Sequence, residues 1–194
     1  MRLAGIPDRC GATTINKVCG SGMKATMLAF DLIRSGSVET VLSGGMESMS
    51  NAPYLLANVR SGLRMGHSDT KDALFTDGLE DAETGDSMGS FAQETADKYQ
   101  LTREEMDEYA IESVNRSQTA IKNGSLKTEI AAMEVKGEKI VDDEQPGRAR
   151  LDKIPTLRPA FKAGGTITAA NASSISDGAS ALLLTSKKVD GKDG

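Results

Sequence analysis

The sequence is poor in the residues that build metal centres, disulfide frameworks and aromatic cores. Its 194 residues include two cysteines, one histidine and no tryptophan, and aromatic residues make up 4% of the chain. The number and spacing of Cys10, Cys19 and His67 suit no zinc site, so we expect no metal. The core must therefore be built from alanine, valine, isoleucine, leucine and nine methionines.

Long hydrophobic runs and an excess of positive charge are also missing. No apolar run approaches the ~18 residues that a membrane-spanning helix needs, and the first residues lack the apolar core of a secretory signal. The net charge of -5 argues against nucleic acid as the main partner. We expect a globular protein that has no membrane partner and a reducing, cytoplasmic setting in which both cysteines are free thiols.

The first 50 residues predict a strand, a helix and a second strand in succession. β-Branched residues over 12–18 indicate the first strand, and the helical pattern over 23–34 ends at Ser35-Gly36. Residues 38–42 indicate the second strand, which ends at the glycines that follow. This succession is typical of a crossover unit in a layered α/β core.

A long, charged and turn-rich segment follows, and it predicts two helices. One begins near Ser87, which suits a helix N-cap, and runs to about Tyr99. The other opens with the capping-box sequence Thr102-Arg103-Glu104-Glu105 and closes at Asn123-Gly124. Apolar residues recur on one face of the second helix, so we expect this segment to be a mainly helical insertion.

Core-like composition returns near the end of the chain. Residues 166–170 alternate as a strand, and residues 179–185 form an apolar run of strand length, whereas residues 187–194 form a polar tail. We therefore expect an α/β fold in which a layered core is interrupted by a long insertion.

Cys19 stands at the predicted turn between the first strand and the first helix. The start of a helix favours a thiolate, and Gly20 and Gly22 let the backbone approach an acyl carbonyl. Backbone N–H groups at such a turn can form an oxyanion hole, so the turn suits acyl transfer through a thioester. The alternative is a small, buried structural cysteine, and a structural role is our prediction for Cys10.

Four ordered blocks of the sequence resemble the thiolase family. The run Asn16-Lys17-Val18-Cys19-Gly20-Ser21-Gly22-Met23-Lys24-Ala25 is similar to the family's nucleophile motif, in which the cysteine attacks an acyl-CoA. Residues 44–50 resemble the segment after the nucleophile helix, residues 77–96 the cofactor-side loop, and residues 157–179 the return to the core. Together these blocks span nearly the whole chain.

The resemblance implies a partial thiolase-like layered core, its first half only, with a long loop-domain insertion. Residues 1–50 would form the N-terminal core, residues 51–159 the loop domain that covers CoA, and residues 160–194 the return to the core. The implied function is that of an acyl-CoA C-acyltransferase (thiolase), which moves an acyl group, expected to be acetyl, to or from CoA through a thioester on Cys19.

The resemblance also implies a binding path for CoA, which enters as a substrate, while no covalently bound cofactor is expected. A narrow pantetheine arm needs apolar walls and a few amide partners. Six residues at matching motif positions would line it: Leu79, Met88, Ala160, Phe161, Ala172 and Ser173. Core packing explains the larger three equally well without the resemblance, and a turn explains residues 171–174. Arg148 and Arg150 are expected on a solvated surface, with a phosphate contact as the alternative.

The sequence departs from the family's pattern at functional positions. Ser87 stands where the cofactor-side loop often carries a histidine. The family's Gly-His-Pro histidine and its second cysteine, which act as base and acid, come from a second half without a counterpart here. His67 matches no motif and is expected in an exposed loop. We expect that the chain lacks this second half and the family's first strand and helix, and that it is unstable, aggregates or needs a complementing chain.

Two other functions stay open. Without those groups, the chain would be a truncated, non-catalytic thiolase-like remnant that at most binds CoA. A β-ketoacyl synthase-like condensing enzyme shares the cysteine at a strand-to-helix turn, although residues 46–50 and 171–173 favour a thiolase. The resemblance further implies a homodimer or homotetramer for the complete family member, with residues 12–18 near the contact.

Overall fold

The computed structural model describes residues 2–187 of the chain. The helices are α1 (Ser21–Arg34), α2 (Met88–Tyr99), α3 (Arg103–Asn123) and α4 (Glu144–Arg148). The strands are β1 (Thr40–Ser48), β2 (Tyr54–Leu56), β3 (Thr70–Asp72), β4 (Met133–Val135), β5 (Glu138–Ile140) and β6 (Asp177–Thr185). Short helical turns are η1 (Arg2–Ala4), η2 (Met49–Asn51), η3 (Val59–Ser61), η4 (Phe75–Leu79) and η5 (Leu151–Thr156). The predicted polar tail, apart from Lys187, lies outside the described residues.

The chain divides into two compact units. The first comprises Met1–Leu74 and Ile175–Gly194, and the second comprises Phe75–Ser174. Residues 51–74, which we assigned to the loop domain, group with the first unit. Residues 160–174, which we assigned to the return to the core, group with the second unit. The role of the middle part as a cover for CoA stays a prediction.

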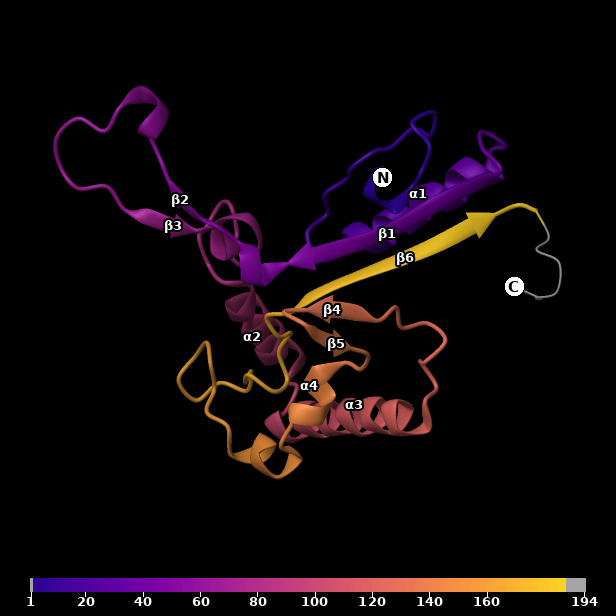
Figure 1. Ribbon diagram of the computed structural model, residues 1–194. Coiled ribbons are helices and arrows are strands. Elements are labelled where there is room, and N and C mark those ends of the chain that lie inside the picture. The colour runs from indigo at the N-terminus through magenta and orange to yellow at the C-terminus, as the bar shows by residue number, and fades with distance from the viewer. Residues whose placement is uncertain (1, 188–194) are drawn as a thin grey trace. The chain divides into compact units, whose positions relative to one another are not determined.

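The centre of the first unit is a two-stranded antiparallel ribbon, with α1 packed along it (Figure 1). β1 and β6 pair over their full lengths, from Thr40 opposite Thr185 to Ser48 opposite Asp177. β6 contains the predicted strand over 179–185, whereas β1 begins later than predicted and continues through its glycines. The ribbon therefore joins two segments that are far apart in the sequence.

Helix α1 follows the predicted pattern and stops where the sequence indicates. The N–H of Ser35 donates to the Asp31 carbonyl at 2.9 Å, and the N–H of Gly36, which has a φ of +74°, donates to the Ile33 carbonyl at 3.0 Å. This left-handed backbone favours glycine and ends the helix. Ala29 is buried, but Met23, Met27 and Phe30 stay more than half exposed, so part of the apolar surface of α1 has no cover in the described chain.

The strand predicted over residues 12–18 is wrong. Only an isolated bridge between Lys17 and Cys19 forms there. A strand persists when its N–H and C=O groups pair with a neighbouring strand, and the described residues place none beside this segment. The predicted strand, helix and strand crossover is therefore also wrong, because α1 leads into β1, whose partner β6 is antiparallel.

The second unit is built mainly on helices, as predicted. Ser87 caps α2 by accepting the N–H of Ser90 at 3.2 Å. Thr102 and Glu105 form the predicted capping box of α3: Thr102 Oγ1 accepts the Glu105 N–H at 3.2 Å, and the Glu105 carboxylate accepts the Thr102 N–H at 2.9 Å. The hydrogen bonds from Thr102 hold the pKa of Glu105 below its ordinary value. α3 ends at Asn123, before Gly124 with a φ of +67°.

The strand predicted over residues 166–170 is also wrong, because the segment is irregular and ends in a turn. Thr168 is fully buried, and its Oγ1 accepts the N–H groups of Ala170 and Asn171 at 3.2 and 3.4 Å. Threonine side chains compete in this way with the strand ladder for backbone donors. The alternating pattern arises here from a side-chain-bonded turn.

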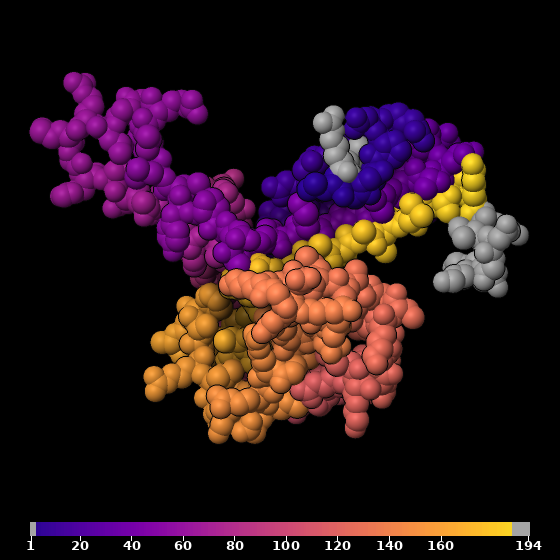
Figure 2. Space-filling model, in the orientation of Figure 1, coloured from indigo at the N-terminus to yellow at the C-terminus, as the bar shows by residue number. Residues whose placement is uncertain are grey.

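The chain exposes far more surface than a compact protein of the same mass. Its accessible area is 16021 Å², whereas a compact protein of 20.5 kDa exposes about 8,900 Å². Even two separate compact units of half that mass would expose only about 11,000 Å². On the ribbon, Met46 is 87% and Leu183 is 68% exposed. Figure 2 shows residues around β2 and β3 projecting from the rest of the first unit as a narrow lobe. None of the described helices is both long enough and apolar enough to cross a membrane.

We expect the purified chain to bind an apolar dye such as ANS and to self-associate at micromolar concentration, because its apolar faces are open. The double variant M46E/L183E should reduce both signals, measured by fluorescence and sedimentation velocity. Leu3→Glu, an exposed leucine outside the ribbon, is the control and should change neither. A chain that stays monomeric, unfolds cooperatively and does not raise the fluorescence of ANS contradicts this expectation.

Candidate functional site

Cys19 lies directly before the start of α1, as the sequence predicts. Gly20 is the N-cap residue, and the thiol of Cys19 is free and exposed. The first N–H groups of a helix carry partial positive charge, which attracts negative charge beside them. Cys19 is therefore not the buried structural cysteine of the alternative. Cys10, predicted to be structural, is exposed as well and packs into no core of the described residues.

The backbone before Cys19 is strained and is held by side chains. Val18 has a φ of +47°, which a β-branched residue rarely adopts. Asn16 Oδ1 accepts the Val18 N–H at 2.8 Å. Ser21 Oγ accepts the Lys17 N–H at 2.8 Å and donates to the Val18 carbonyl at 2.7 Å. Strain of this kind, about 1–3 kcal/mol, persists only where the surroundings enforce it. Asn16 and Ser21 thus fix the turn that presents the thiol.

The predicted oxyanion hole is partly occupied by the turn itself. The N–H of Gly20 donates to the Lys17 carbonyl at 2.9 Å, and the N–H of Ser21 donates to the Val18 carbonyl at 3.1 Å. An oxyanion at this turn could use these two donors only by competing with the hydrogen bonds that shape it.

Gly22 and Gly45 let the start of α1 touch β1 through backbone atoms. A Cβ built on Gly22 would lie 3.3 Å from the Gly45 Cα, and one on Gly45 would lie 3.0 Å from the Gly22 Cα. A 3.2 Å hydrogen bond between Thr26 Oγ1 and Ser43 Oγ joins the same two elements. We expected Gly22 to make room for an acyl carbonyl, but the structure shows it making room for a strand.

Gly44 makes a second close approach, on the side of β6. A Cβ at Gly44 would collide with the carbonyl oxygen of Ser180. The consecutive glycines Gly44 and Gly45 therefore let β6 and α1 pack against the backbone of β1 at the same point along the strand. This packing sets the position of Cys19 within the first unit.

The six residues predicted to line the pantetheine path all lie in the second unit, whereas Cys19 lies in the first. Leu79 ends η4 and is half-buried, and Met88 begins α2. The ring of Phe161 packs against Gly89, which is next to Met88, so close that a Cβ there would overlap it. Ala160, Ala172 and Ser173 lie in the irregular segment that follows η5. Their role in binding CoA stays a prediction.

An ion pair ties this segment to α2. Lys162 Nζ donates to Asp97 Oδ2 at 2.6 Å, and Gln93 donates to the other oxygen at 2.9 Å. These two hydrogen bonds, with that from Lys162 the stronger influence, hold the pKa of Asp97 below its ordinary value. The Asp97 side chain is about half exposed and that of Lys162 more than half, so the pair contributes little to stability on its own.

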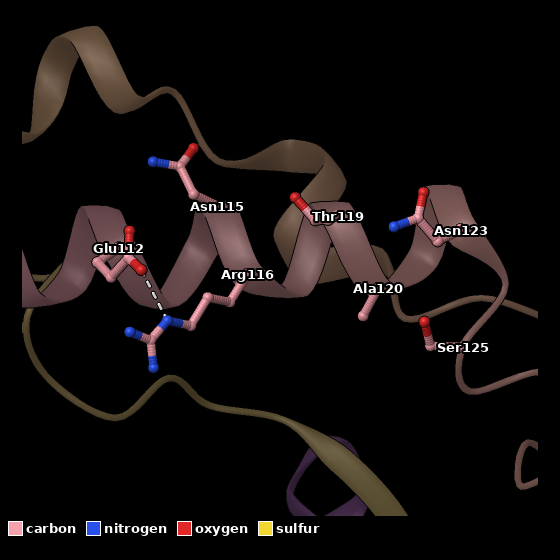
Figure 3. Close-up of a pocket in the computed structure, with 7 residues that line it drawn as sticks. All are labelled: Glu112, Asn115, Arg116, Thr119, Ala120, Asn123 and Ser125. Atoms are coloured by element: carbon pink, nitrogen blue, oxygen red, sulfur yellow. Dashed lines mark hydrogen bonds and ion pairs between the residues drawn. The ribbon is translucent and has the colours of Figure 1, made fainter.

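A surface hollow lies elsewhere, along α3 (Figure 3). It has a volume of about 350 Å³ and is lined by Glu112, Asn115, Arg116, Thr119, Ala120, Asn123 and Ser125. Arg116 and Glu112 face each other across one helical turn at 2.7 Å. None of the predicted site residues lines it, and the residues that do are mostly polar and exposed rather than apolar, so it indicates no ligand.

The remaining residues considered from the sequence lie on the surface. His67 is exposed in a loop before β3, as predicted. Arg148 and Arg150 are exposed too, and Arg148 pairs with Glu144 at 3.3 Å within α4. Sequence reasoning missed the roles of Asn16 and Ser21, although both residues stand inside the nucleophile motif.

Residues 1–188 match the family described as "Thiolase, N-terminal domain". The chain belongs to the thiolase family. Among similar proteins, acetyl-CoA acetyltransferase 2 of Arabidopsis thaliana is 49% identical over 94% of this chain and 47% of its own length. Acetyl-CoA acetyltransferase of Saccharomyces cerevisiae is 42% identical over 96% of this chain and 48% of its own length.

Solved structures agree in fold. The Acat5 thiolase of Ascaris suum in complex with coenzyme A matches with a TM-score of 0.88 and 41% identity over 95% of this chain and 48% of its own. Human mitochondrial 3-ketoacyl-CoA thiolase in complex with CoA matches with a TM-score of 0.87 and 39% identity, over 96% and 47%. The partial thiolase-like fold is confirmed, and the chain spans about half the length of the relatives it matches.

Substituting Gly44 should destabilise the first unit. In Gly44→Ala the new methyl group meets the Ser180 carbonyl, and we expect a loss of about 1–3 kcal/mol from the forced separation of β1 and β6. Hydrogen exchange of the β1 amides measures it. Gly178→Ala, on β6 with open space around its Cβ position, is the matched control and should stay near wild type. Equal exchange rates in the two variants contradict the close approach.

Removing the Ser21 hydroxyl should make Cys19 less reactive. Ser21→Ala frees Val18 to leave its strained conformation, and Cys19 then loses its place at the helix start. We expect alkylation by iodoacetamide at pH 7 to slow by about two- to fivefold, with Cys10 as the internal reference. Ser35→Ala, at the other end of α1, is the control. Adding Val18→Gly should restore the rate, because glycine adopts positive φ without strain; no restoration contradicts the explanation.

Proposed function

We propose that this chain carries the nucleophile of a thiolase-type acyltransferase. Cys19 takes an acyl group, expected to be acetyl, from acyl-CoA as a thioester. The group then passes to the carbanion of a second acyl-CoA in condensation, or to CoA in thiolysis. The observation that carries this proposal is the free, exposed thiol of Cys19 at the start of α1, on a turn that Asn16 and Ser21 hold in a strained conformation. Family membership supports it.

The acyl-transfer step is a thiol–thioester exchange. The Cys19 thiolate attacks the acyl carbonyl, a bond from Sγ to the carbonyl carbon forms, and the bond to the CoA sulfur breaks. The CoA thiolate leaves and takes a proton. The exposed position of the thiol gives a large thioester access to it.

CoA is the substrate that we propose for the second unit. Two similar solved structures are described as complexes with CoA. Leu79, Met88 and Phe161 offer apolar contacts for a pantetheine arm, and the exposed Ser173 offers a hydroxyl. Ala160 and Ala172 offer small side chains beside which a narrow arm fits. No metal or covalently bound cofactor enters this chemistry.

Full turnover needs an acid and a base that these residues do not supply. His67 is exposed in a loop of the first unit and matches no family motif. A second candidate function is that of a non-catalytic thiolase-like protein that binds CoA. We propose a homo-oligomer for the complete family member and a cytoplasmic setting, which the two free thiols support.

The deciding experiment is acylation of the whole chain by acetyl-CoA, followed by peptide mass spectrometry. We expect acetyl on Cys19, none in Cys19→Ala, and undiminished labelling of Cys19 in Cys10→Ala. Thiolysis of acetoacetyl-CoA, assayed in parallel, separates the candidates: multiple turnovers refute the non-catalytic one. If acetyl-CoA leaves Cys19 unmodified, or labels Cys10 equally fast, the proposed nucleophile is wrong.

A further inference from the structure

A buried glutamine of α2 holds the irregular segment that carries most of the proposed CoA residues. Gln93 is 2% exposed. Its Oε1 accepts the N–H groups of Thr166 and Ile167 at 2.8 and 3.1 Å. Its Nε2 donates to Thr166 Oγ1 at 3.1 Å and to Asp97 at 2.9 Å. The amide therefore replaces the strand partner that residues 166–167 would otherwise need.

A second anchor comes from α3. Asn171 Oδ1 accepts the Thr168 N–H at 2.7 Å, and its Nδ2 donates to the Thr166 carbonyl at 3.0 Å and to Asp107 Oδ1 at 3.1 Å. Asp107 is 4% exposed on α3. Arg103 Nε donates to Asp107 Oδ2 at 2.6 Å and balances its buried charge.

The same arginine fixes the entrance to the segment. Arg103 Nη2 donates to the carbonyl groups of Ile154 and Leu157 at 2.9 and 3.0 Å. One guanidinium thus joins α3, the end of η5 and, through Asp107, the turn at Asn171. Because this donor is charged and largely buried, these hydrogen bonds are stronger than ordinary ones.

This network lies directly beside proposed binding residues without including them. Residues 160–173 contain no helix or strand, so side-chain anchors decide their path. Ala160 donates its N–H to the Ile167 carbonyl at 2.9 Å, which couples it to the anchor at Gln93. Ala172 and Ser173 directly follow Asn171. Gly165 must be a glycine here, because a Cβ would lie 2.5 Å from Gln93 Oε1.

We propose that Gln93, Asp107 and Asn171 are positioning residues of the CoA site. They hold Ala160, Phe161, Ala172 and Ser173 in one arrangement, so that the pantetheine arm meets a preformed wall rather than a mobile segment. The gain in affinity comes from ordering before binding. The inference rests on the proposed function, because it assigns these residues to the binding of CoA.

The test measures the affinity of the 194-residue chain for CoA by calorimetry. Gln93→Leu keeps the size of the side chain but removes all four hydrogen bonds of the Gln93 amide, and we expect at least about tenfold weaker binding. The double variant Gln93→Glu/Asp97→Asn keeps the oxygen acceptors for Thr166 and Ile167, lets residue 97 donate to the new carboxylate, and should recover most of that loss. Thr102→Ala, which breaks the capping box in the same unit and costs about 1 kcal/mol of stability, is the control and should bind as wild type.

The outcomes separate this inference from the proposed function. Wild type that does not bind CoA overturns the proposed function, and this inference with it. Wild type that binds, with Gln93→Leu binding equally well or Thr102→Ala weakened to the same extent, overturns the inference alone. Hydrogen exchange on wild type is the check if Gln93→Leu does not fold: CoA should slow the amides of residues 166–168 and leave those at the centre of α3 unchanged. Unchanged amides at 166–168 contradict the proposal.

Discussion

The direct backbone contact between Gly22 and Gly45 determines how the first unit is built. It allows the start of α1 to lie against β1 without side chains between them. Gly44 permits a still closer approach of β6 to β1. Since Cys19 directly precedes Gly20, the N-cap of α1, its position depends on these glycines as well as on the turn that Asn16 and Ser21 hold. A site with an exposed nucleophile is thus anchored by three residues that have no side chain.

Elements whose signals are local could be predicted from the sequence. α2 and α3 appear where their caps place them, because Ser87, Thr102 and Glu105 bond to backbone groups within the same turn. The strands over 12–18 and 166–170 were mispredicted because a strand needs a partner that lies elsewhere in the chain. In one case the described residues contain no partner, and in the other a glutamine takes its place.

In the candidate site, too, only the features with a local sequence signal could be predicted. Cys19 could be found from its motif and its place before a helix, and the structure puts it there. The strain at Val18 could not be seen, because composition favours ordinary strand backbone for a β-branched residue. The pairing of Asp107 with Asn171 was equally hidden, since it joins residues 64 positions apart. Sequence patterns thus identify the reactive residue more readily than the residues that hold it in place.

The turn at Cys19 is shaped by Asn16 and Ser21 rather than by the Cys19 side chain. The sulfur atom can therefore be replaced without changing the backbone that presents it. No side-chain hydrogen bond of Cys19 itself enters the set that holds Val18. A serine at position 19 is expected to inherit the same backbone and the same exposure, with oxygen in place of sulfur. Such a chain presents the intact architecture with a far weaker nucleophile, which makes it a means of observing an acyl-CoA before, rather than after, transfer.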